Sequence, residues 1–281
     1  MKMRVLFGMI GIPFFLIVCT GIIRNDWSGK TEATLKTNID IPESAAVNES
    51  EKQVQHLACI MDGNRRWAKR NGLKPWYGHR EGVEAVRKVV QFCMQKKIKY
   101  LSLYTFSLEN FKRSYEENSY LFSLMVQEAQ KGVSEFRKHG IRLRFRGDRS
   151  LFPQELCPLL DTVEKETQDL DTLHVTFLFC YGGRQEIANA TKNIALDLKD
   201  GKLTADAITP ELISSYLWTH DLPDPDLIIR TGGFSRLSNF LLYQAAYSEI
   251  YVFDCMWPDI TTQHLQEAYD SFVQCTRNFG A

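Results

Sequence analysis

A group of charged and polar residues follows a short apolar run near residue 60. Residues 56–61 are apolar after the first, and Asp62-Gly63-Asn64-Arg65-Arg66 comes directly behind them, before Trp67. The apolar run predicts a buried strand, and the residues after Asn64 predict the start of a helix. A carboxylate and several cations would then lie where open α/β sheets bind ligands and where a helix N-terminus favours anions. The same pattern is also typical of an Asx turn that caps a helix with a solvated basic face.

Three further predicted strands also end in polar or glycine-bearing loops. These loops are Ser107-Leu108-Glu109-Asn110, Gly182-Gly183-Arg184 and Arg230-Thr231-Gly232-Gly233. The carboxyl ends of parallel strands share one edge of a sheet, so the four loops would line one cleft. Arginine suits two-pronged binding of phosphate oxygens, and six arginines fall near these loops: Arg65, Arg66, Arg113, Arg184, Arg230 and Arg236.

A phosphate cleft of this kind makes Asp62 and Glu249 candidate ligands of Mg²⁺. This ion is commonly held by one or two carboxylates together with substrate phosphates. The alternative for Glu249 is an ordinary solvated glutamate. The sequence has no Walker-type Gly-x4-Gly-Lys-Ser/Thr motif and no Gly-x-Ser-x-Gly elbow, which argues against a P-loop and a serine hydrolase.

Length and composition narrow the classes of protein further. The 281 residues are 44% apolar and 24% charged, which suits one large domain or two small ones with a sizeable core. A net charge of zero argues against a nucleic-acid-binding protein. The seven cysteines form no CxxC pair, and several lie in apolar runs, which indicates buried thiols of a reducing compartment.

The first 50 residues differ from the rest of the chain. Residues 5–23 carry no charge over 19 positions, just long enough to span a bilayer, and residues 25–50 read as a polar linker. We interpret residues 1–24 as a membrane anchor. A secretory signal and a start codon further downstream are the alternatives.

The remainder alternates strand-like and helix-like segments, which predicts an α/β fold with a mainly parallel sheet of six strands. The expected strands are residues 54–61, 100–106, 141–145, 173–181, 227–229 and 250–253. Strand 141–145 alternates apolar residues with arginine, so we expect it to be less covered than the others or to lie near an edge of the sheet. The expected helices follow Asn64 and cover residues 79–98, 117–139, 153–168, 186–198, 210–219 and 261–272.

Several motifs together resemble the cis-prenyltransferases, the family that includes undecaprenyl diphosphate synthases. The family's first signature is matched by Met-Asp-Gly-Asn-Arg-Arg-Trp-Ala at 61–68 with Gly78-His79. Its second signature is matched by Tyr-Thr-Phe-Ser-Leu-Glu-Asn-Phe at 104–111. The third resembles Ile-Arg-Thr-Gly-Gly at 229–233, followed by residues 236–242 and 244–249 and closed by Trp-Pro-Asp at 257–259. The resemblance runs from about residue 54 to 280, so residues 51–281 are the expected catalytic domain.

The resemblance implies a reaction and a role for each matching residue. An allylic diphosphate, typically farnesyl diphosphate, loses pyrophosphate and is joined to isopentenyl diphosphate with a new Z double bond, and repetition gives a long polyprenyl diphosphate. Asp62 and Asn110 are the implied catalytic residues, and Asp62 and Glu249 the implied Mg²⁺ ligands. Substrate binding is implied for Gly63, Asn64, Arg65, Arg66, Trp67, His79, Ser107, Glu109, Phe111, Arg113, Arg230, Arg236 and Ser238.

The family is usually homodimeric, and its substrates imply a site in the cytoplasm, with membrane association through residues 5–23 and the lipid product. This sequence departs from the family pattern at Pro75, where arginine is common, and at Phe234-Ser235, where an acidic residue and histidine are common. We also expect that bulky Leu178 and Phe179 shorten the product.

A trans-type prenyl synthase and a catalytically silent partner subunit are the two alternatives to a cis-prenyltransferase. A trans-type synthase needs aspartates one helical turn apart, and Pro223 and Pro225 forbid that helix among the only candidate aspartates. A catalytically silent prenyl-binding subunit of a heteromeric transferase is the second reading. Such subunits usually lack the first-signature aspartate, which is present here as Asp62.

Overall fold

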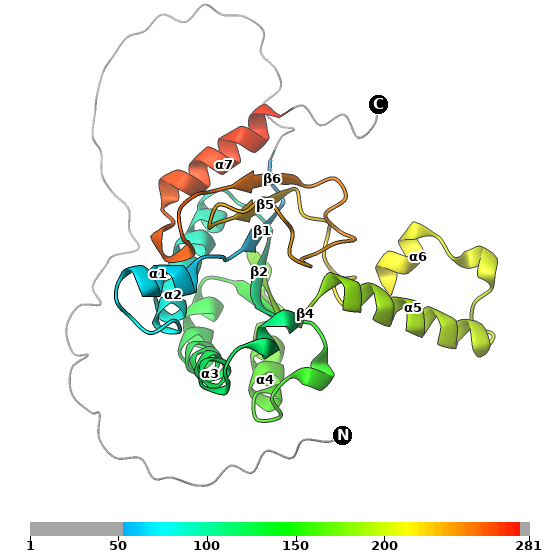
Figure 1. Ribbon diagram of the computed structural model, residues 1–281. Coiled ribbons are helices and arrows are strands. Elements are labelled where there is room, and N and C mark those ends of the chain that lie inside the picture. Colours follow the sequence, from blue (N-terminus) through cyan, green and yellow to red (C-terminus); the bar gives the residue numbers. More distant parts are fainter. Residues whose placement is uncertain (1–52, 276–281) are drawn as a thin grey trace, which may run out of the picture. The chain divides into compact units, whose positions relative to one another are not determined.

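A single parallel sheet organises the part of the chain that the structure describes. The structure is a computed structural model that describes residues 53–275, apart from the side chains of 129–131. Its six strands lie in the order β3-β4-β2-β1-β5-β6, and all neighbours are parallel (Figure 1). The predicted fold class is therefore confirmed. The proposed anchor and linker lie outside the described residues, and the domain boundaries stay predictions.

The strand bounds follow the apolar runs of the sequence closely. The strands are β1 (His56–Ile60), β2 (Tyr100–Ser107), β3 (Ile141–Arg146), β4 (Leu173–Tyr181), β5 (Leu227–Arg230) and β6 (Glu249–Val252). The first described strand, β1, lies in the middle of the sheet, since it pairs with β2 on one side and with β5 on the other. Ile60 of β1 is in register with Arg230 of β5, so the residues that follow both strands meet at one edge.

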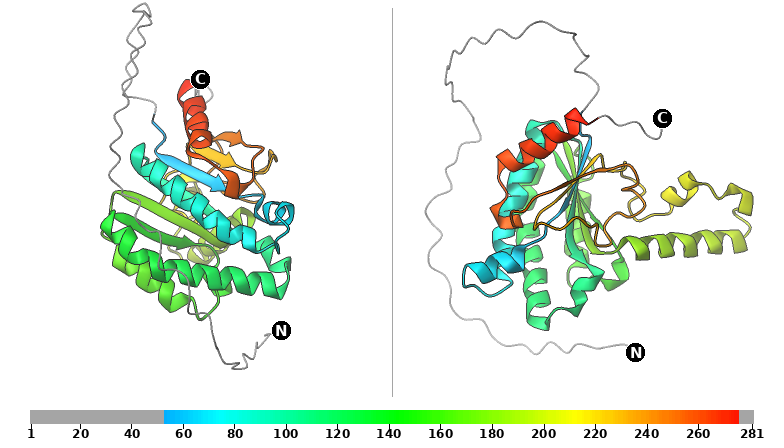
Figure 2. Two further views of the ribbon diagram at one scale, coloured as in Figure 1. Left: turned by 90° about the vertical axis from the view of Figure 1, so that its left-hand side faces the viewer. Right: turned by 45° about the horizontal axis from the view of Figure 1, so that its top comes forward.

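The helices divide between the two faces of the sheet. The longer ones are α2 (Tyr77–Gln95), α3 (Tyr115–Lys138), α4 (Cys157–Thr167), α5 (Gly183–Lys199) and α7 (Thr262–Gln274), and the short ones are α1 (Asn64–Arg70) and α6 (Pro210–Ser215). Helices α2, α3, α4 and α7 cover one face, whereas α5 and α6 project away from the other (Figure 2). Single 3₁₀ turns cover Leu108–Lys112 (η1), Arg149–Leu151 (η2), Ala205–Ala207 (η3) and Trp257–Asp259 (η4). No helix among the described residues is long and apolar enough to cross a bilayer.

Side-chain alternation along the strands separates the core into two clusters. The larger cluster lies under α2, α3, α4 and α7 and includes Leu57, Leu103, Val175 and Phe179. The smaller one lies on the second face and includes Ile60, Leu178, Tyr181 and Phe240. Successive strand residues point to opposite faces, which places Leu178 and Phe179 on different sides of the sheet.

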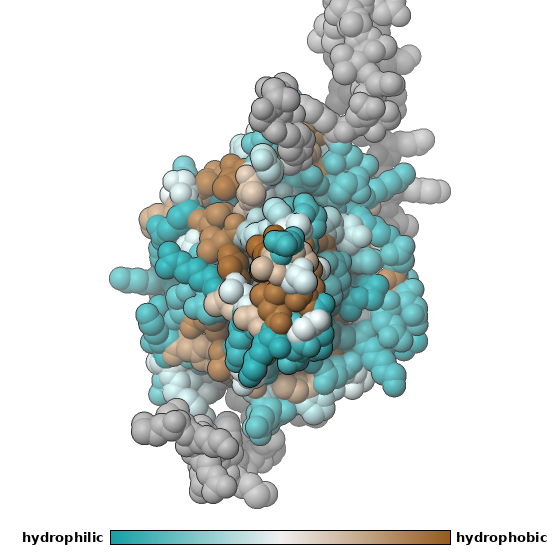
Figure 3. Space-filling view, turned by 90° about the vertical axis from the view of Figure 1, so that its right-hand side faces the viewer, coloured by the Kyte–Doolittle hydropathy of each residue, from teal (hydrophilic) through white to brown (hydrophobic). Residues whose placement is uncertain are grey.

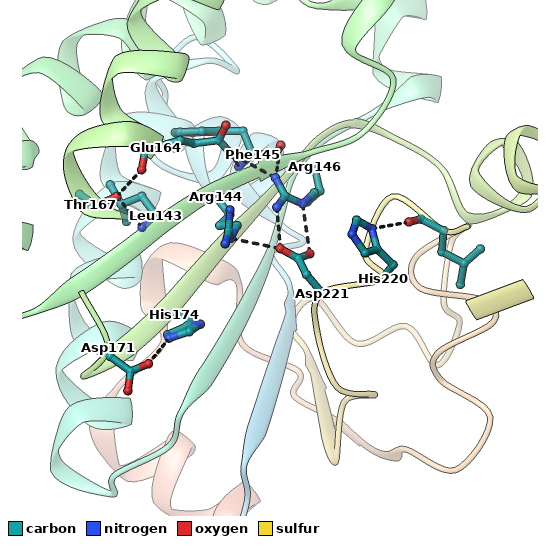
Figure 4. Close-up of polar contacts among 11 residues, drawn as sticks. Leu143, Arg144, Phe145, Arg146, Glu164, Thr167, Asp171, His174, His220 and Asp221 are labelled. Atoms are coloured by element: carbon teal, nitrogen blue, oxygen red, sulfur yellow. Dashed lines mark hydrogen bonds and ion pairs between the residues drawn. The ribbon is translucent and has the colours of Figure 1, made fainter. Parts of the chain in front are cut away.

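The alternation of β3 has a clear structural origin. Ile141, Leu143 and Phe145 are buried on the helix-covered face, and β3 is an edge strand, as predicted. The arginines point to the second face, where Arg144 and Arg146 bind the carboxylate of Asp221, and Arg146 also binds Glu164 (Figure 4).

Two predicted helices are shorter in the structure than in the sequence pattern. Helix α4 begins at Cys157 and not at residue 153, with Pro158 in its first turn, where proline fits best. Helix α6 ends at Ser215 and not at residue 219. The backbone N–H of Thr219 donates to the buried carboxylate of Glu186, which takes this residue out of the helical hydrogen-bond pattern.

We expect Gly78→Ala to lower the free energy of unfolding. Gly78 is buried in the first turn of α2, and an added Cβ would lie 1.9 Å from the backbone carbonyl oxygen of Asn64. Overpacking of this kind costs about 1–3 kcal/mol, and here α1 itself must move. Urea denaturation measures the loss. Glu81→Ala on the exposed side of the same helix is the control, and an equal effect of both changes would contradict the prediction.

Candidate active site

The carboxylate of Asp62 lies between two arginines at the carboxyl edge of the sheet. The Arg230 guanidinium donates to Oδ2 at 2.7 Å, and Arg66 Nη2 lies 3.3 Å from Oδ1. The Thr231 hydroxyl also donates to the Asp62 carbonyl oxygen at 2.7 Å. The Arg230 side chain is only 4% exposed, so its charge requires a partner. Asp62 is thus oriented from two separate elements, the first turn after β1 and the end of β5.

Glycines permit this close approach of chain segments. Gly63 has φ +106° and precedes α1, and Gly232 has φ +88° in the loop after β5. A Cβ at Gly232 would lie 2.2 Å from Arg66 Nη2, and the Gly232 carbonyl oxygen accepts from Arg66 Nη1 at 3.0 Å. Any larger residue at position 232 would displace the arginine that reaches Asp62.

Arg230 also organises the third-signature loop. Its guanidinium donates to the Ser238 hydroxyl at 2.8 Å and to the carbonyl oxygen of Arg236. Ser238 and Asn239 both have positive φ, and Asn239 continues the connection. Its backbone oxygen accepts from Gly183 N–H and its side-chain oxygen from Arg184 N–H, so this loop satisfies the first N–H groups of α5.

Two arginines and a histidine converge on the buried carboxylate of Glu117, in the first turn of α3. Arg113, Arg65 and His79 lie 3.4–3.6 Å from its oxygens, and Glu117 is 3% exposed. Contact with the His79 imidazole and the nearby arginines lowers the pKa of Glu117. Burial lowers the pKa of His79, and it also lowers that of Arg113, against the opposing effect of Glu117. Glu117 therefore holds one ordered group of cations beside the Asp62 group.

The second-signature residues lie on η1 and close their own turn. The side chain of Asn110 accepts from Ser107 N–H at 3.1 Å, and Ser107 caps the turn in return. Glu109 accepts from the Asn239 side chain at 3.0 Å, which joins η1 to the third-signature loop. Phe111 packs edge-on against Phe106, next to the aromatic residues of the larger core.

Three predicted site residues take part in contacts of another kind. Trp67 Nε1 donates to Asp259 at 2.7 Å, and the Asn64 side chain donates to the Met61 carbonyl oxygen, both of which fix α1. Glu249 is the first residue of β6 and is in register with Leu227, at the amino end of the sheet. Five residue steps separate this level from Asp62, roughly 16 Å. One chain does not bring Glu249 beside Asp62, and its role as a ligand stays a prediction.

A cavity of about 500 Å³ lies elsewhere, between the end of β3 and the α5–α6 region. None of the predicted site residues lines it. Several of its polar groups are paired: Arg146 with Glu164 and with Asp221 outside the lining (Figure 4), and Trp218 with Asn189. We therefore place the candidate site at the Asp62 edge and not in this cavity.

Sequence reasoning missed residues that support the site from behind. Glu117 is the one that the sequence could have indicated, since it begins a predicted helix four residues after Arg113, a spacing at which opposite charges often pair. Buried Glu186 accepts from Tyr181, Thr219 and Gln244 and joins α5 to the segments around it. No spacing rule identifies this network, because its members come from four separate segments.

We expect Glu117→Gln to destabilise the fold in a pH-dependent way. The pKa of Glu117 is lowered in the folded state, so its charge stabilises the fold above the ordinary value of 4.5, and this contribution disappears as the pH falls through the lower folded-state pKa. Loss of the buried charge should cost about 1–3 kcal/mol at pH 7. Urea denaturation from pH 7 down to pH 3 should show wild type and variant converging.

The matched control for this experiment is Glu116→Gln, an exposed neighbour in the same helical turn. It should change stability by less than about 0.5 kcal/mol at either pH. A Glu117→Gln difference that stayed constant down to pH 3 would show that shape, and not charge, sets the effect.

Comparison with known proteins agrees with this geometry. The sequence model of the family described as "Putative undecaprenyl diphosphate synthase" matches residues 60–280. An isoprenyl transferase of Agrobacterium fabrum is 46% identical over 227 residues, covering 81% of this chain and 92% of the relative. A ditrans,polycis-undecaprenyl-diphosphate synthase of Legionella pneumophila is 39% identical, covering 82% and 96%.

Solved structures give the same answer at the level of the fold. Lavandulyl diphosphate synthase from Lavandula x intermedia, solved with dimethylallyl diphosphate, superposes with a TM-score of 0.79 at 31% identity, covering 82% of this chain and 99% of that one. A probable undecaprenyl diphosphate synthase from Campylobacter jejuni superposes with a TM-score of 0.68 at 33% identity, with the same coverage. The chain belongs to the undecaprenyl diphosphate synthase family of cis-prenyltransferases.

Proposed function

We propose that this protein condenses isopentenyl diphosphate onto an allylic diphosphate, repeatedly and with Z geometry, to give a long polyprenyl diphosphate. The observation that carries the proposal is the Asp62 carboxylate, fixed by Arg66 and Arg230 at the carboxyl edge of the sheet. An unrelated phosphate-binding protein would need the cations, but it would not need a carboxylate aimed among them. A transferase that must expel pyrophosphate uses both.

Arg65, Arg66 and Arg113 would stabilise the negative charge that develops on the departing diphosphate. As the allylic C1–O bond breaks, negative charge grows on the diphosphate oxygens. Arg65, Arg66 and Arg113 would bind these oxygens from fixed positions, so little reorganisation is needed during reaction. Glu117 keeps Arg65 and Arg113 ordered beforehand. Allylic substrate therefore belongs on the α1–α3 side of Asp62.

The second substrate belongs on the other side, at the third-signature loop. Arg230, Arg236 and Ser238 would bind isopentenyl diphosphate and present its double bond to the allylic C1. The condensation then needs one proton removed from isopentenyl C2. Asn110 lies on η1 and Ser107 caps it. Glu109 ties this turn to the loop, and we assign proton transfer to the turn.

The described residues could hold Mg²⁺ only together with the phosphates of a substrate. Among residues 53–275, no three His, Cys, Asp or Glu side chains gather as a complete cation site. Mg²⁺ often uses one or two carboxylates together with substrate phosphates, and Asp62 provides one carboxylate among phosphate-binding arginines. Asp62 would hold the ion. Glu249 lies at the opposite end of the sheet in the same chain, so it would be the second predicted ligand only if a second copy of the chain supplied it. The bound ion supplies charge neutralisation at the leaving diphosphate.

The printed names of relatives support the substrate class and leave the primer open. The Legionella pneumophila relative is named as specific for (2E,6E)-farnesyl diphosphate, and a 40% identical Pyrococcus abyssi relative is named as specific for geranylgeranyl diphosphate. We propose farnesyl diphosphate as the primer. The relatives bear the names of synthases and transferases, and Asp62 is present here with both arginine partners, which leaves the silent-subunit reading without support.

The length of the product should depend on the size of the side chains that line the path of the growing prenyl chain. Phe179 packs against Phe106, Phe122 and Phe152 on the helix-covered face, while Leu178 lies on the second face. The two residues therefore cannot line one tunnel together. We now assign the proposed shortening of the product to Phe179 alone.

Dimerisation and membrane association remain part of the proposal. Leu196 on α5 and Ile208 after η3 are 48% and 42% exposed, and Ile250 on edge strand β6 is 49% exposed. Figure 3 shows apolar residues gathered on the side from which α5 and α6 project. Exposed apolar patches and open strand edges commonly mark subunit contacts, so we propose a homodimer through α5, α6 and β6. The predicted segment 5–23 would add the membrane association, with the catalytic domain in the cytoplasm.

We expect turnover that depends on Asp62 and on Mg²⁺. Full-length protein is incubated with farnesyl diphosphate and radiolabelled isopentenyl diphosphate, and butanol-extractable label is counted. Asp62→Asn keeps the shape but removes the charge, so the rate should fall by at least about 10²-fold, and EDTA should abolish it. Asp254→Asn, a nearby carboxylate beside Gly233, serves as the control. Full turnover by Asp62→Asn would refute the assigned role, and chromatography of the label gives the chain length.

We expect Leu196→Asp to weaken self-association. A charge placed in an apolar subunit contact must be desolvated without a partner, which opposes assembly. Sedimentation velocity should give a mass near twice the 32.4 kDa of one chain for the wild type, and a mass closer to that of one chain for the variant. Leu73→Asp is the matched control, because Leu73 is 44% exposed and lies between α1 and α2, outside the proposed contact. A monomeric wild type would overturn the proposed dimer.

A further inference from the structure

Phe234 lies where two substrate-binding arginines meet. Its ring centroid is 4.9 Å from Arg66 Cζ and 4.2 Å from Arg236 Cζ, both within the range of a cation–π contact. The side chain is 40% exposed, which is unusual for a phenylalanine in a polar loop. Burial in the core therefore does not explain a phenylalanine at this position, and its contacts with the two arginines are the remaining explanation.

The loop backbone fixes where the ring stands. Gly232 and Gly233 both have positive φ, at +88° and +74°, and their N–H groups donate to the carbonyl oxygens of Cys255 and Phe253 at 2.8 Å. Arg66 holds the loop from the other side through the Gly232 carbonyl oxygen. Phe234 follows directly after these two residues, so the hydrogen bonds of residues 232 and 233 fix the backbone from which its ring extends.

The two arginines differ in what else holds them. Arg66 contacts Asp62 and the Gly232 carbonyl oxygen. For Arg236, the contacts recorded within residues 53–275 are the Phe234 ring and the hydrogen bond from Arg230 to its backbone oxygen, with no ion pair to its guanidinium. The exposed Arg236 side chain therefore depends on the ring for its orientation.

A π face is well suited to this place. Two guanidinium groups near one another repel, and the acidic residue that is common at this position in the family would offset the repulsion by adding a negative charge. An aromatic ring attracts both cations through its quadrupole and adds no net charge. It orders the arginines and leaves their donors available.

We propose that Phe234 is a positioning residue that holds Arg66 and Arg236 at a fixed separation, so that the allylic and isopentenyl diphosphates are bound in register. This inference rests on the proposed function, which assigns Arg66 to the allylic diphosphate and Arg236 to isopentenyl diphosphate. The ring contacts neither reacting carbon in this account and acts through the two guanidinium groups.

The test compares Phe234→Leu with Phe234→Tyr. Leucine keeps an apolar side chain but has no π face, whereas tyrosine keeps the face. Phe234→Leu should raise the KM for isopentenyl diphosphate by about three- to tenfold, with kcat within about twofold, and Phe234→Tyr should stay near wild type. Leu151→Ala, an exposed apolar change four strands away in the sheet, should change neither constant.

A double-mutant cycle asks whether the ring acts through Arg236. Calorimetry with inorganic pyrophosphate measures binding without turnover, for wild type, Phe234→Leu, Arg236→Gln and the double variant. Phe234→Leu should weaken pyrophosphate binding severalfold in the wild-type background and have a much smaller effect once Arg236 is glutamine. Equal effects in both backgrounds would overturn the positioning role.

The outcomes separate this inference from the proposed function. Wild-type turnover with an unchanged KM in Phe234→Leu overturns the inference and leaves the function standing. Absent turnover in wild type overturns the function, and the pyrophosphate cycle still decides whether the ring orders Arg236. Weak binding in both Phe234→Leu and Phe234→Tyr would assign the effect to the native ring's packing and would also overturn the inference.

Discussion

The ion pair between Asp62 and Arg230 is the constraint on which the rest of the site depends. Arg230 is almost fully buried, and a buried guanidinium without a partner is strongly unfavourable, so the two residues must arrive at one place. Asp62 follows β1 and Arg230 ends β5, and the two meet because β1 and β5 are parallel neighbours with Ile60 in register with Arg230. Sheet order, strand direction and the position of the loops at one edge are thus tied to one electrostatic contact.

A site built to bind two diphosphates must keep many cations together before any substrate enters. This protein uses three kinds of contact to do so. Asp62 pairs with Arg66 and Arg230, Glu117 gathers Arg65, His79 and Arg113, and the Phe234 ring contacts Arg66 and Arg236. Arg66 belongs to two of these groups, and it links the allylic side to the isopentenyl side. Order among like charges is therefore distributed over the site and does not come from a single counter-ion.

The sequence predicted the sheet and its helices because the signals are local. The apolar run before Asp62 and the alternation in β3 each report the environment of a strand, and the bounds of β4 were predicted to the residue. Glu186, Gln244 and Asn239 could not be predicted in the same way, because their roles depend on contacts between segments 25 to 130 positions apart. The level of Glu249 in the sheet was equally hidden, since it depends on the register of β6 with β5 and not on the residues around it.

The place of β1 in the sheet has a consequence for how the protein is made. β1 is the first described strand, yet one of its edges stays unpaired until residues 227–230 have been synthesised and folded, about 170 positions later. Contacts of such long sequence separation form slowly, and an open central strand invites wrong pairing while it waits. Since the same late step brings Arg230 to Asp62, the complete site for two diphosphates should emerge together with the closed sheet. A nascent chain that has not reached β5 therefore has most of its core residues and the cations around Glu117, but it lacks Arg230, Arg236 and Ser238 on the isopentenyl side of the site.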